Sequence, residues 1–233
     1  MVCDKLMRGL GFDDGYVSQG GDLGSLVSRI LGVTSDACKA VHLDLAVGIK
    51  PESAEETKDF SPAYMKALKR YEEFGAMGSA YAREHGTRPA TIGLVLSSSP
   101  IALLAWFVIG EKFLQWSETS PSMQEMLDGA TLYWLTESFA RSIYPYRRVP
   151  GDPPSLLHND KSMYIKKPMG YSWRPGELAP VPTPLVAKSG NLIWSRDHDD
   201  GGHFAAWEKP KRFVKDMEDF CSEAWPMVNE ARL

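Results

Sequence analysis

The chain has 233 residues, the length of one large domain or one and a half average ones. Hydrophobic residues make up 43% of it and charged residues 24%, which excludes a disordered chain, a collagen and a coiled coil. Its 26 basic residues are outnumbered by 30 acidic ones, and the net charge of −4 argues against a nucleic-acid partner. We therefore expect a globular protein without a nucleic-acid-binding surface.

Cysteine spacing and hydropathy exclude further classes of protein. Cys3, Cys38 and Cys221 are odd in number and far apart, so the sequence predicts neither a disulfide framework nor a zinc site. Free thiols fit a reducing, cytoplasmic interior. The longest apolar stretch, residues 92–110, is interrupted by Ser97-Ser98-Ser99-Pro100, which indicates two helices and a turn rather than a membrane span.

The first fifty residues predict a strand–turn–helix–strand order, which is typical of a parallel α/β sheet. Residues 2–10 look helical, and Tyr16–Gln19 form a short strand. After the turn at residues 20–24, apolar residues recur with helical spacing from Leu23 to Leu31. A second strand is expected at Val41–Val47.

The middle of the chain has a different pattern. Residues 51–149 predict a helical cap, in which Pro89, Pro100 and Pro121 separate the helices. A strand returns at residues 192–194, and residues 210–225 predict a final amphipathic helix. We therefore expect residues 1–50 and 150–233 to form an α/β core around the cap at 51–149.

The turn Gly20-Gly21-Asp22-Leu23-Gly24 has the layout of a nucleophile elbow, in which a sharp strand-to-helix turn exposes one functional side chain. We expect a Cβ at Gly20 or at Gly24 to clash with neighbouring backbone. The alternative is an ordinary glycine-rich turn with Asp22 as a helix N-cap. A carboxylate at this position can attack a saturated carbon and form an ester, which water must then hydrolyse.

Ester hydrolysis requires a base, and an orienting acid is expected with it. His203 follows the last expected strand, and Glu177 precedes that strand, which is the chain order of elbow hydrolases. The alternatives are a surface histidine with a solvated carboxylate, or a metal site formed by His198, Asp200 and His203. These three residues match no common ligand spacing, so no metal is predicted. We expect His198 to face water and His42 to be a hydrogen-bonded core residue.

Several segments together resemble the epoxide hydrolases of the α/β-hydrolase fold, of the microsomal and fungal type. The resemblance covers residues 3–225, nearly the whole chain. It implies the α/β-hydrolase fold, with a mostly parallel sheet, a helical cap insertion and no cofactor. The segments that carry it are Gly20–Ser25, Thr136–Arg147, Lys167–Trp173 and Asp197–Ala206.

The resemblance also assigns roles. It implies that Asp22 is the nucleophile, His203 the base and Glu177 the orienting acid, and that the N–H group of Leu23 binds the oxyanion. Two cap tyrosines hold the epoxide oxygen in this family, and Tyr81 and Tyr144 match them. Tyr146 is the alternative to Tyr144, and Tyr171 is a more remote one. The implied reaction opens an epoxide to a vicinal diol through an ester on Asp22.

One departure from the family concerns the N-terminal strands. The family has a long region before its elbow, which supplies four strands and a His-Gly-x-Pro loop, and this chain has no such motif. The expectation is a sheet without its N-terminal strands, with an exposed edge that invites pairing with another chain, including a second copy in a homo-oligomer. The alternative function is therefore a truncated, inactive or partner-dependent relative.

The expected substrate is a small, apolar epoxide. A haloalkane dehalogenase, the other enzyme with an Asp elbow, usually carries an indole N–H beside its nucleophile, and Leu23 argues against that activity. The cap aromatics Trp106, Phe107, Phe113, Trp116 and Trp134 suggest an apolar pocket. The terminal Ala231-Arg232-Leu233 resembles the Ser-Lys-Leu peroxisomal address, although a chance match is the alternative. Fungal relatives of this type suggest a role in secondary metabolism.

Overall fold

The computed structural model describes residues 1–106, 116–148 and 158–230 of the chain. These residues form two compact units. The sheet unit comprises Met1–Tyr71 and Ser155–Leu233, and the helical unit comprises Glu72–Pro154. Phe107, Phe113 and the terminal tripeptide, on which two of the expectations depend, lie outside the described residues.

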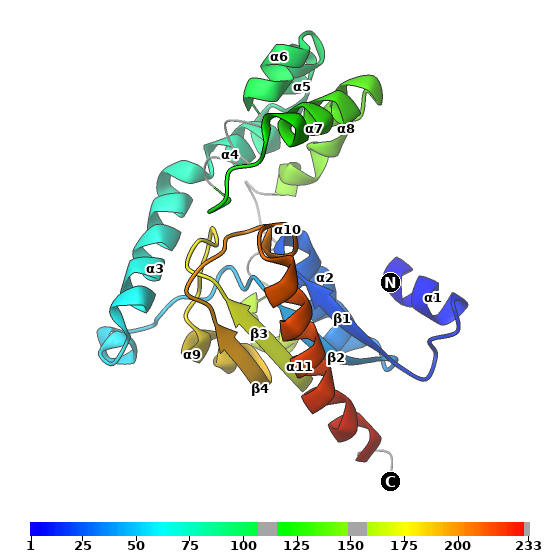
Figure 1. Cartoon of the computed structure of the whole chain (residues 1–233), viewed down its shortest axis with the longest axis vertical. Helices are drawn as coiled ribbons and strands as arrows, with labels where there is room; N and C mark the ends of the chain where they lie inside the picture. The colour runs from blue at the N-terminus through cyan, green and yellow to red at the C-terminus, as the bar shows by residue number, and fades with distance from the viewer. Residues whose placement is uncertain (107–115, 149–157, 231–233) are drawn as a thin grey trace. The chain divides into compact units, whose positions relative to one another are not determined.

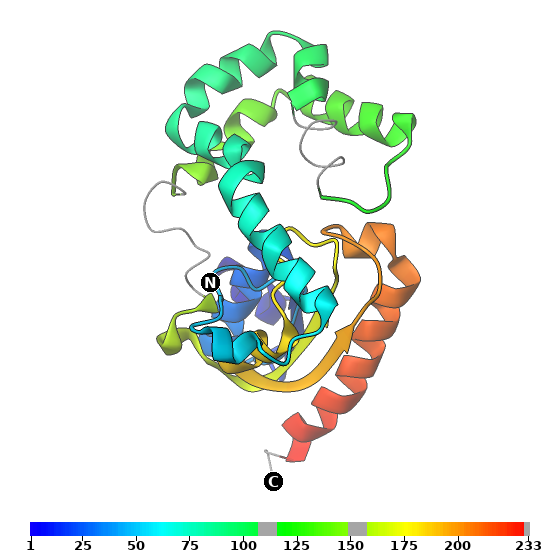
Figure 2. The same ribbon diagram turned by 90° about the vertical axis from the view of Figure 1, so that its left-hand side faces the viewer.

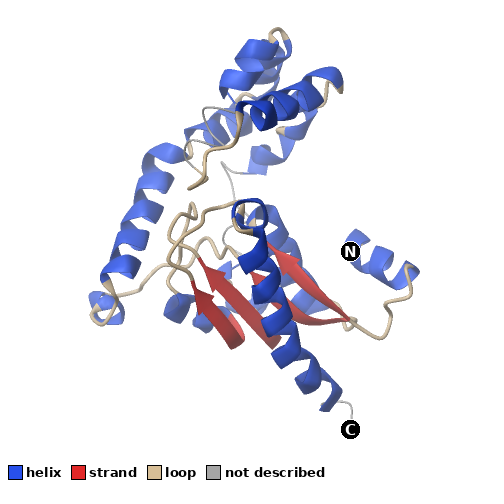
Figure 3. Cartoon of the chain, in the orientation of Figure 1, coloured by secondary structure: helices blue, strands red, loops and turns tan. Residues whose placement is uncertain are grey.

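The sheet unit contains four parallel strands among its described residues, in the order β1-β2-β3-β4 (Figure 1, Figure 3). The strands are β1 (Tyr16–Gly20), β2 (Cys38–Leu43), β3 (Ile165–Trp173) and β4 (Gly190–Asp197). Its helices are α1 (Val2–Gly9), α2 (Asp22–Thr34), η1 (Ala54–Thr57), α3 (Pro62–Glu73, which runs into the helical unit), η6 (Lys161–Met163), α9 (Thr183–Val186), η7 (Ala187–Ser189), α10 (Ala205–Glu208) and α11 (Pro210–Glu230).

Alternation along the strands gives the sheet two faces of different character. One face carries the larger apolar side chains, including Val41, Leu43 and Met169, and α2 and α9 cover it (Figure 1, Figure 2). The opposite face includes two small residues of the central strands, Ala40 and Gly170, beside the ring of His42. A Cβ at Gly170 would lie 2.7 Å from the ring of Phe220, so the absent side chain makes room for α11 to pack closely.

The helical unit is built from short segments around a separate apolar cluster that includes Leu96, Leu103, Phe139 and Ile143. Its described elements are η2 (Phe74–Gly78), α4 (Ala80–Thr87), α5 (Pro89–Ser97), α6 (Pro100–Leu103), α7 (Met123–Leu135), α8 (Phe139–Ser142) and η4 (Tyr144–Arg148). Over the described residues, no helix combines the length and the apolar composition that crossing a bilayer requires.

The expected elements are largely present, with three differences. The second strand ends at Leu43 rather than at Val47, and the apolar residues after it are buried without pairing in the sheet. Strand β3 was not predicted, because Pro168 and Gly170 interrupt the strand pattern. Residues 51–71 belong to the sheet unit and not to the helical one, because Phe60, Tyr64 and Leu68 pack against the core of the sheet.

The turn between β1 and α2 holds Asp22 in a strained conformation. The N-cap of α2 is Gly21, and Asp22 is the first residue of the helix, with a φ of 44°. A non-glycine residue in this region costs about 1–3 kcal/mol, and such strain often occurs at functional sites. The interpretation of Asp22 as an N-cap is therefore wrong.

The two outer glycines of the turn differ in the space around them. A Cβ at Gly20 would lie 2.1 Å from the carbonyl oxygen of Gly24, which no small adjustment relieves. A Cβ at Gly24 would meet nothing within 4 Å. The expected clash is therefore confirmed at Gly20 and wrong at Gly24.

These surroundings predict opposite effects for two matched substitutions. Gly20→Ala should lower the free energy of unfolding by about 3 kcal/mol or more, because the clash is with backbone. Gly24→Ala should leave it unchanged or raise it by up to about 1 kcal/mol, because alanine favours a helix. Urea unfolding of both variants measures the difference, and equal losses of stability would contradict this account of the turn.

Candidate active site

Three strand ends bring Asp22, Glu177 and His203 together in the sheet unit. Asp22 follows β1, Glu177 follows β3 and His203 follows β4, and parallel strands end at the same edge of a sheet. The Nδ1 atom of His203 lies 2.6 Å from Glu177 Oε1, a hydrogen-bond distance. Its Nε2 atom lies 3.6 Å from Asp22 Oδ2, which suits an ion pair but is too long for a hydrogen bond. One imidazole therefore lies between two carboxylates.

Three glycines join the loop that carries Glu177 to the loop that carries His203. The Gly176 N–H donates to the Gly201 carbonyl at 3.0 Å, and Gly176 forms a parallel β-bridge with Gly202. A Cβ at Gly176 would lie 2.7 Å from Gly201 O, so this approach requires glycine. The bridge fixes the spacing of the two loops directly beside the acid and the histidine.

Helix α3 holds the acid loop from its other side. Arg70 donates from Nε to the Glu177 carbonyl at 2.7 Å and from Nη2 to the Gly176 carbonyl at 3.0 Å. The Leu178 N–H donates to Glu177 Oε1 at 2.6 Å, which fixes the carboxylate itself. Sequence reasoning missed Arg70, because nothing near it in the chain signals a contact with residue 177.

Burial and charge set the protonation of His203. Burial of the ring disfavours the imidazolium, but the Glu177 and Asp22 carboxylates outweigh it and raise the pKa of His203 to about 10. The side chains of His203 and Glu177 are only 3% exposed, whereas that of Asp22 is 59% exposed. The arrangement is a buried acid–imidazole pair that faces an accessible carboxylate.

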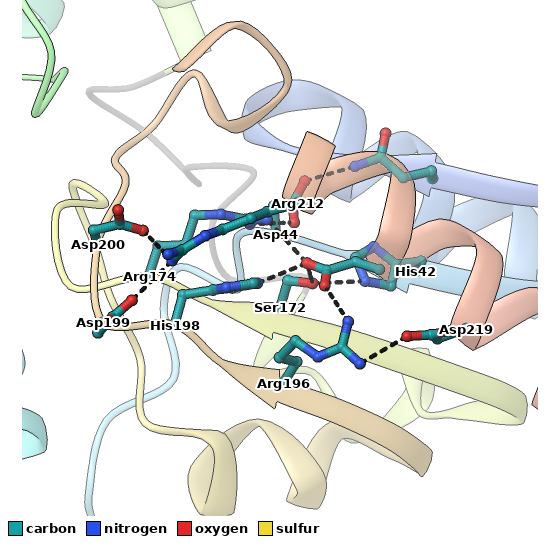
Figure 4. Close-up of polar contacts among 12 residues, drawn as sticks. His42, Asp44, Ser172, Arg174, Arg196, His198, Asp199, Asp200, Arg212 and Asp219 are labelled. Atoms are coloured by element: carbon teal, nitrogen blue, oxygen red, sulfur yellow. Dashed lines mark hydrogen bonds and ion pairs between the residues drawn. The ribbon is translucent and has the colours of Figure 1, made fainter. Parts of the chain in front are cut away.

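A buried ionic network lies at the same edge of the sheet (Figure 4). Its hub is Asp216 of α11, whose carboxylate accepts hydrogen bonds from Ser172, Arg174 and Arg196. His198 Nε2 also lies 2.7 Å from this carboxylate, and His198 is buried. The expectation that His198 faces water is therefore wrong. Burial raises the pKa of Asp216, but its hydrogen bonds with His198, Ser172 and Arg196 outweigh burial and lower this pKa to about 2.

His42 and His158 lie in the core. His42 is fully buried, with Nε2 3.0 Å from the Ser172 hydroxyl, which confirms the expected hydrogen-bonded core residue. His158 accepts a hydrogen bond from Arg29 Nε at 2.8 Å and lies 3.1 Å from the hydroxyl of Ser25, one turn after Asp22. Burial, reinforced by the Arg29 charge, lowers the pKa of His158 to about 3.

The candidate tyrosines occupy different surroundings. Tyr81 is buried in the helical unit, and its ring centroid lies 5.7 Å from that of Tyr146. Tyr144 is 44% exposed. Tyr171 belongs to the sheet core and donates its hydroxyl to the Val181 carbonyl, so it is committed to packing.

The remaining site expectations concern Leu23 and a metal. Leu23 lies in the first turn of α2, where backbone N–H groups have no acceptor within the helix. Its N–H group could therefore bind an oxyanion. Across the part of the chain that the structure describes, no group of three potential metal ligands comes together.

The charges around His203 predict a pH-dependent stability. A folded-state pKa of about 10, against the ordinary value of 6.5, gives a stabilisation that is fully present below pH 6.5 and lost as the pH rises through about 10. His203→Gln should abolish this loss between pH 6.5 and 10. His158→Gln is the matched control, because His158 is neutral in the folded state over this range and mostly neutral in the unfolded state above about pH 7.5. Thermal unfolding across the range measures both, and an unchanged alkaline loss in His203→Gln would contradict the assignment.

Known proteins resemble this chain over nearly its whole length. No family model matches it. A Dothistroma septosporum protein whose name assigns it to the epoxide hydrolases is 43% identical over 227 residues, which is 96% of this chain and 52% of that protein. The Aspergillus niger epoxide hydrolase structure is 50% identical, with a TM-score of 0.85, over 96% of this chain and 56% of that one.

A more distant structure agrees in fold. The juvenile hormone epoxide hydrolase of Bombyx mori superposes with a TM-score of 0.82 at 24% identity, over 97% of this chain and 58% of the other. The chain spans about half the length of the curated relatives that it matches. It therefore has the α/β-hydrolase fold and is homologous to epoxide hydrolases, of which it spans about half.

Proposed function

We propose that this sheet unit performs the chemistry of an epoxide hydrolase, with Asp22 as nucleophile, His203 as base and Glu177 as the acid that orients His203. One observation supports this assignment most directly. The exposed Asp22 carboxylate lies 3.6 Å from Nε2 of an imidazole whose other nitrogen is bound to a buried glutamate. The homology to epoxide hydrolases selects the substrate class.

In the first step, an Asp22 oxygen attacks an epoxide carbon, and the bond between that carbon and the ring oxygen breaks. The electron pair of the broken bond goes to the ring oxygen, which becomes an alkoxide unless it receives a proton. Phenol hydroxyl groups are suitable donors, because they stabilise the charge as it develops. The product of this step is a hydroxyalkyl ester on Asp22.

Ester formation changes the protonation of His203. Before it, two anions favour the imidazolium. The ester is neutral, so one of these anions disappears and the pKa of His203 falls. The imidazole then loses its proton and can act as a base. The geometry thus gives a reason for the base to become available only after the nucleophile has reacted.

In the second step, neutral His203 removes a proton from water, and the water oxygen attacks the carbonyl carbon of the Asp22 ester. The N–H group of Leu23 donates to the oxyanion of the tetrahedral intermediate. When this intermediate collapses, the bond between the carboxyl carbon and the alkyl oxygen breaks and the leaving oxygen takes the proton held by the His203 imidazolium, which releases the diol and restores the Asp22 carboxylate. Glu177 stabilises the imidazolium that forms, as the acid does in other acid–histidine pairs.

The proposal assigns the phenol donors to the helical unit. Tyr81 and Tyr144 are the pair that the family resemblance implies. The neighbouring rings of Tyr81 and Tyr146 favour Tyr146 as the partner of Tyr81, whereas Tyr144 is 44% exposed. An apolar epoxide, a peroxisomal location and a role in secondary metabolism remain predictions from the sequence.

The proposed ester gives a direct test. His203→Gln should react with styrene oxide, gain the mass of one epoxide on Asp22, and hydrolyse the ester at least about 10²-fold more slowly than the wild-type chain. Intact-protein and peptide mass spectrometry detect the adduct. In ¹⁸O-water, a single wild-type turnover should place label in Asp22, because water attacks the carboxyl carbon.

The control is Asp22→Asn, which should form no adduct. Absence of an adduct from both the wild-type chain and His203→Gln, over a panel of aryl and alkyl epoxides, would reject the proposal. That outcome would favour the inactive or partner-dependent relative. An adduct on another residue would reject Asp22 as the nucleophile.

Phenylalanine substitutions test the phenol donors separately. Tyr81→Phe and Tyr146→Phe should each slow ester formation by about 10²-fold, because each removes one donor to the epoxide oxygen. Tyr144→Phe should change the rate little. Stopped-flow measurement of ester formation compares the three variants, and a loss confined to Tyr81 and Tyr144 would restore Tyr144 as the partner.

A further inference from the structure

Arg174 begins the turn that carries Glu177. The Glu177 N–H donates to the Arg174 carbonyl at 3.3 Å, so the two residues are the ends of a single backbone turn after β3. The Arg174 side chain is only 3% exposed. The position of Arg174 therefore affects where the Glu177 carboxylate lies.

The guanidinium of Arg174 is fixed from two sides (Figure 4). Nη1 donates to Asp44 Oδ1 at 2.8 Å, at the end of β2, and Nη2 donates to Asp216 Oδ2 at 3.1 Å, on α11. Asp44 also accepts a hydrogen bond of 2.7 Å from Gln19 of β1. The planar fork of an arginine matches two carboxylates in this way, whereas a lysine ammonium is a point charge without such a fork.

The same side chain supports the loop that carries His203. A Cβ at Gly201 would lie 3.2 Å from Arg174 Cδ, so the arginine stem packs against the backbone of this loop. Gly201 has a φ of +91° and accepts the hydrogen bond from Gly176. Arg174 thus contacts both loops whose spacing sets the distance between Glu177 and His203.

We propose that Arg174 is a positioning residue for the acid–base pair: its guanidinium, fixed between Asp44 and Asp216, holds the turn that presents Glu177 to His203. This proposal rests on the roles proposed above for Glu177 and His203. It assigns Arg174 no contact with the substrate.

Titration of His203 in the 233-residue chain tests the proposal without requiring turnover. Glu177 and Asp22 are charged groups of the described residues that face His203. In Arg174→Gln, the Glu177 carboxylate should move away, and the His203 midpoint measured by NMR should fall by at least about one pH unit. Loss of the positive charge alone would raise the midpoint, because it favours the imidazolium. The sign of the shift therefore separates positioning from direct electrostatics.

Arg196→Gln is the matched control. Arg196 also donates to Asp216, but it belongs to neither loop, so its loss should not lower the His203 midpoint. If Arg174→Gln does not fold, Arg174→Lys provides the test and should lower the midpoint in the same direction. A folded Arg174 variant with a wild-type or raised midpoint would overturn the proposal, as would an equal fall in Arg196→Gln.

A kinetic comparison adds a second measurement. In Arg174→Gln, ester hydrolysis should slow by about 10- to 100-fold, while ester formation changes by less than about 3-fold, because only hydrolysis needs the acid–base pair. Equal slowing of both steps would indicate a merely structural role and reject the proposal. Failure of the wild-type chain to form an ester would reject the proposed function instead, and the His203 titration would still decide the role of Arg174.

Discussion

The hydrogen bond from the Gly176 amide to the Gly201 carbonyl is the contact on which the candidate site depends most. It joins two loops that are distant in sequence, and Glu177 and His203 each lie within two residues of it. The bridge needs glycine, since any side chain at position 176 would enter the facing backbone. The parallel sheet supplies the rest, because β1 ends beside these loops and presents Asp22.

The charged residues in and around the candidate site differ in their exposure to solvent. Asp22 is accessible, whereas Arg174, Asp216 and Glu177 are almost completely buried. Buried ion pairs add little net stability, because desolvation offsets their attraction. Here the ion pairs matter for geometry. Asp44, after β2, and Asp216, on α11, both bind the guanidinium of Arg174 and so connect it to two other elements. Buried charges of this kind also make the site sensitive to substitutions that leave the apolar core intact.

Most of the fold could be predicted from local patterns in the sequence. The spacing from Leu23 to Leu31 predicts α2 correctly, and the glycine-rich turn predicts the exposed position of Asp22. Strand β3 escaped prediction because its glycine reflects packing against Phe220, which is distant in sequence. The burial of His198 was missed for a similar reason, since its partner Asp216 lies on α11.

Those residues of the candidate site that follow a known order along the chain could be predicted from the sequence. Asp22, Glu177 and His203 follow the order of elbow hydrolases, and the structure brings these three side chains together. Arg70 and Arg174 could not be identified in this way, because their side chains contact residues that are distant in sequence, and such contacts leave no spacing pattern. The choice among the tyrosines also depends on tertiary contact, since Tyr144 and Tyr146 lie in the same short segment.

Strands β2 and β3 are adjacent in the sheet, although Leu43 and Ile165 are separated by the whole helical unit. The helical unit is thus an insertion in the single connection that crosses from β2 to β3. The residues that pair β2 with β3 all lie outside this unit, so its length and composition can vary without a change in that pairing. Homologous proteins can therefore diversify this unit while they retain one scaffold.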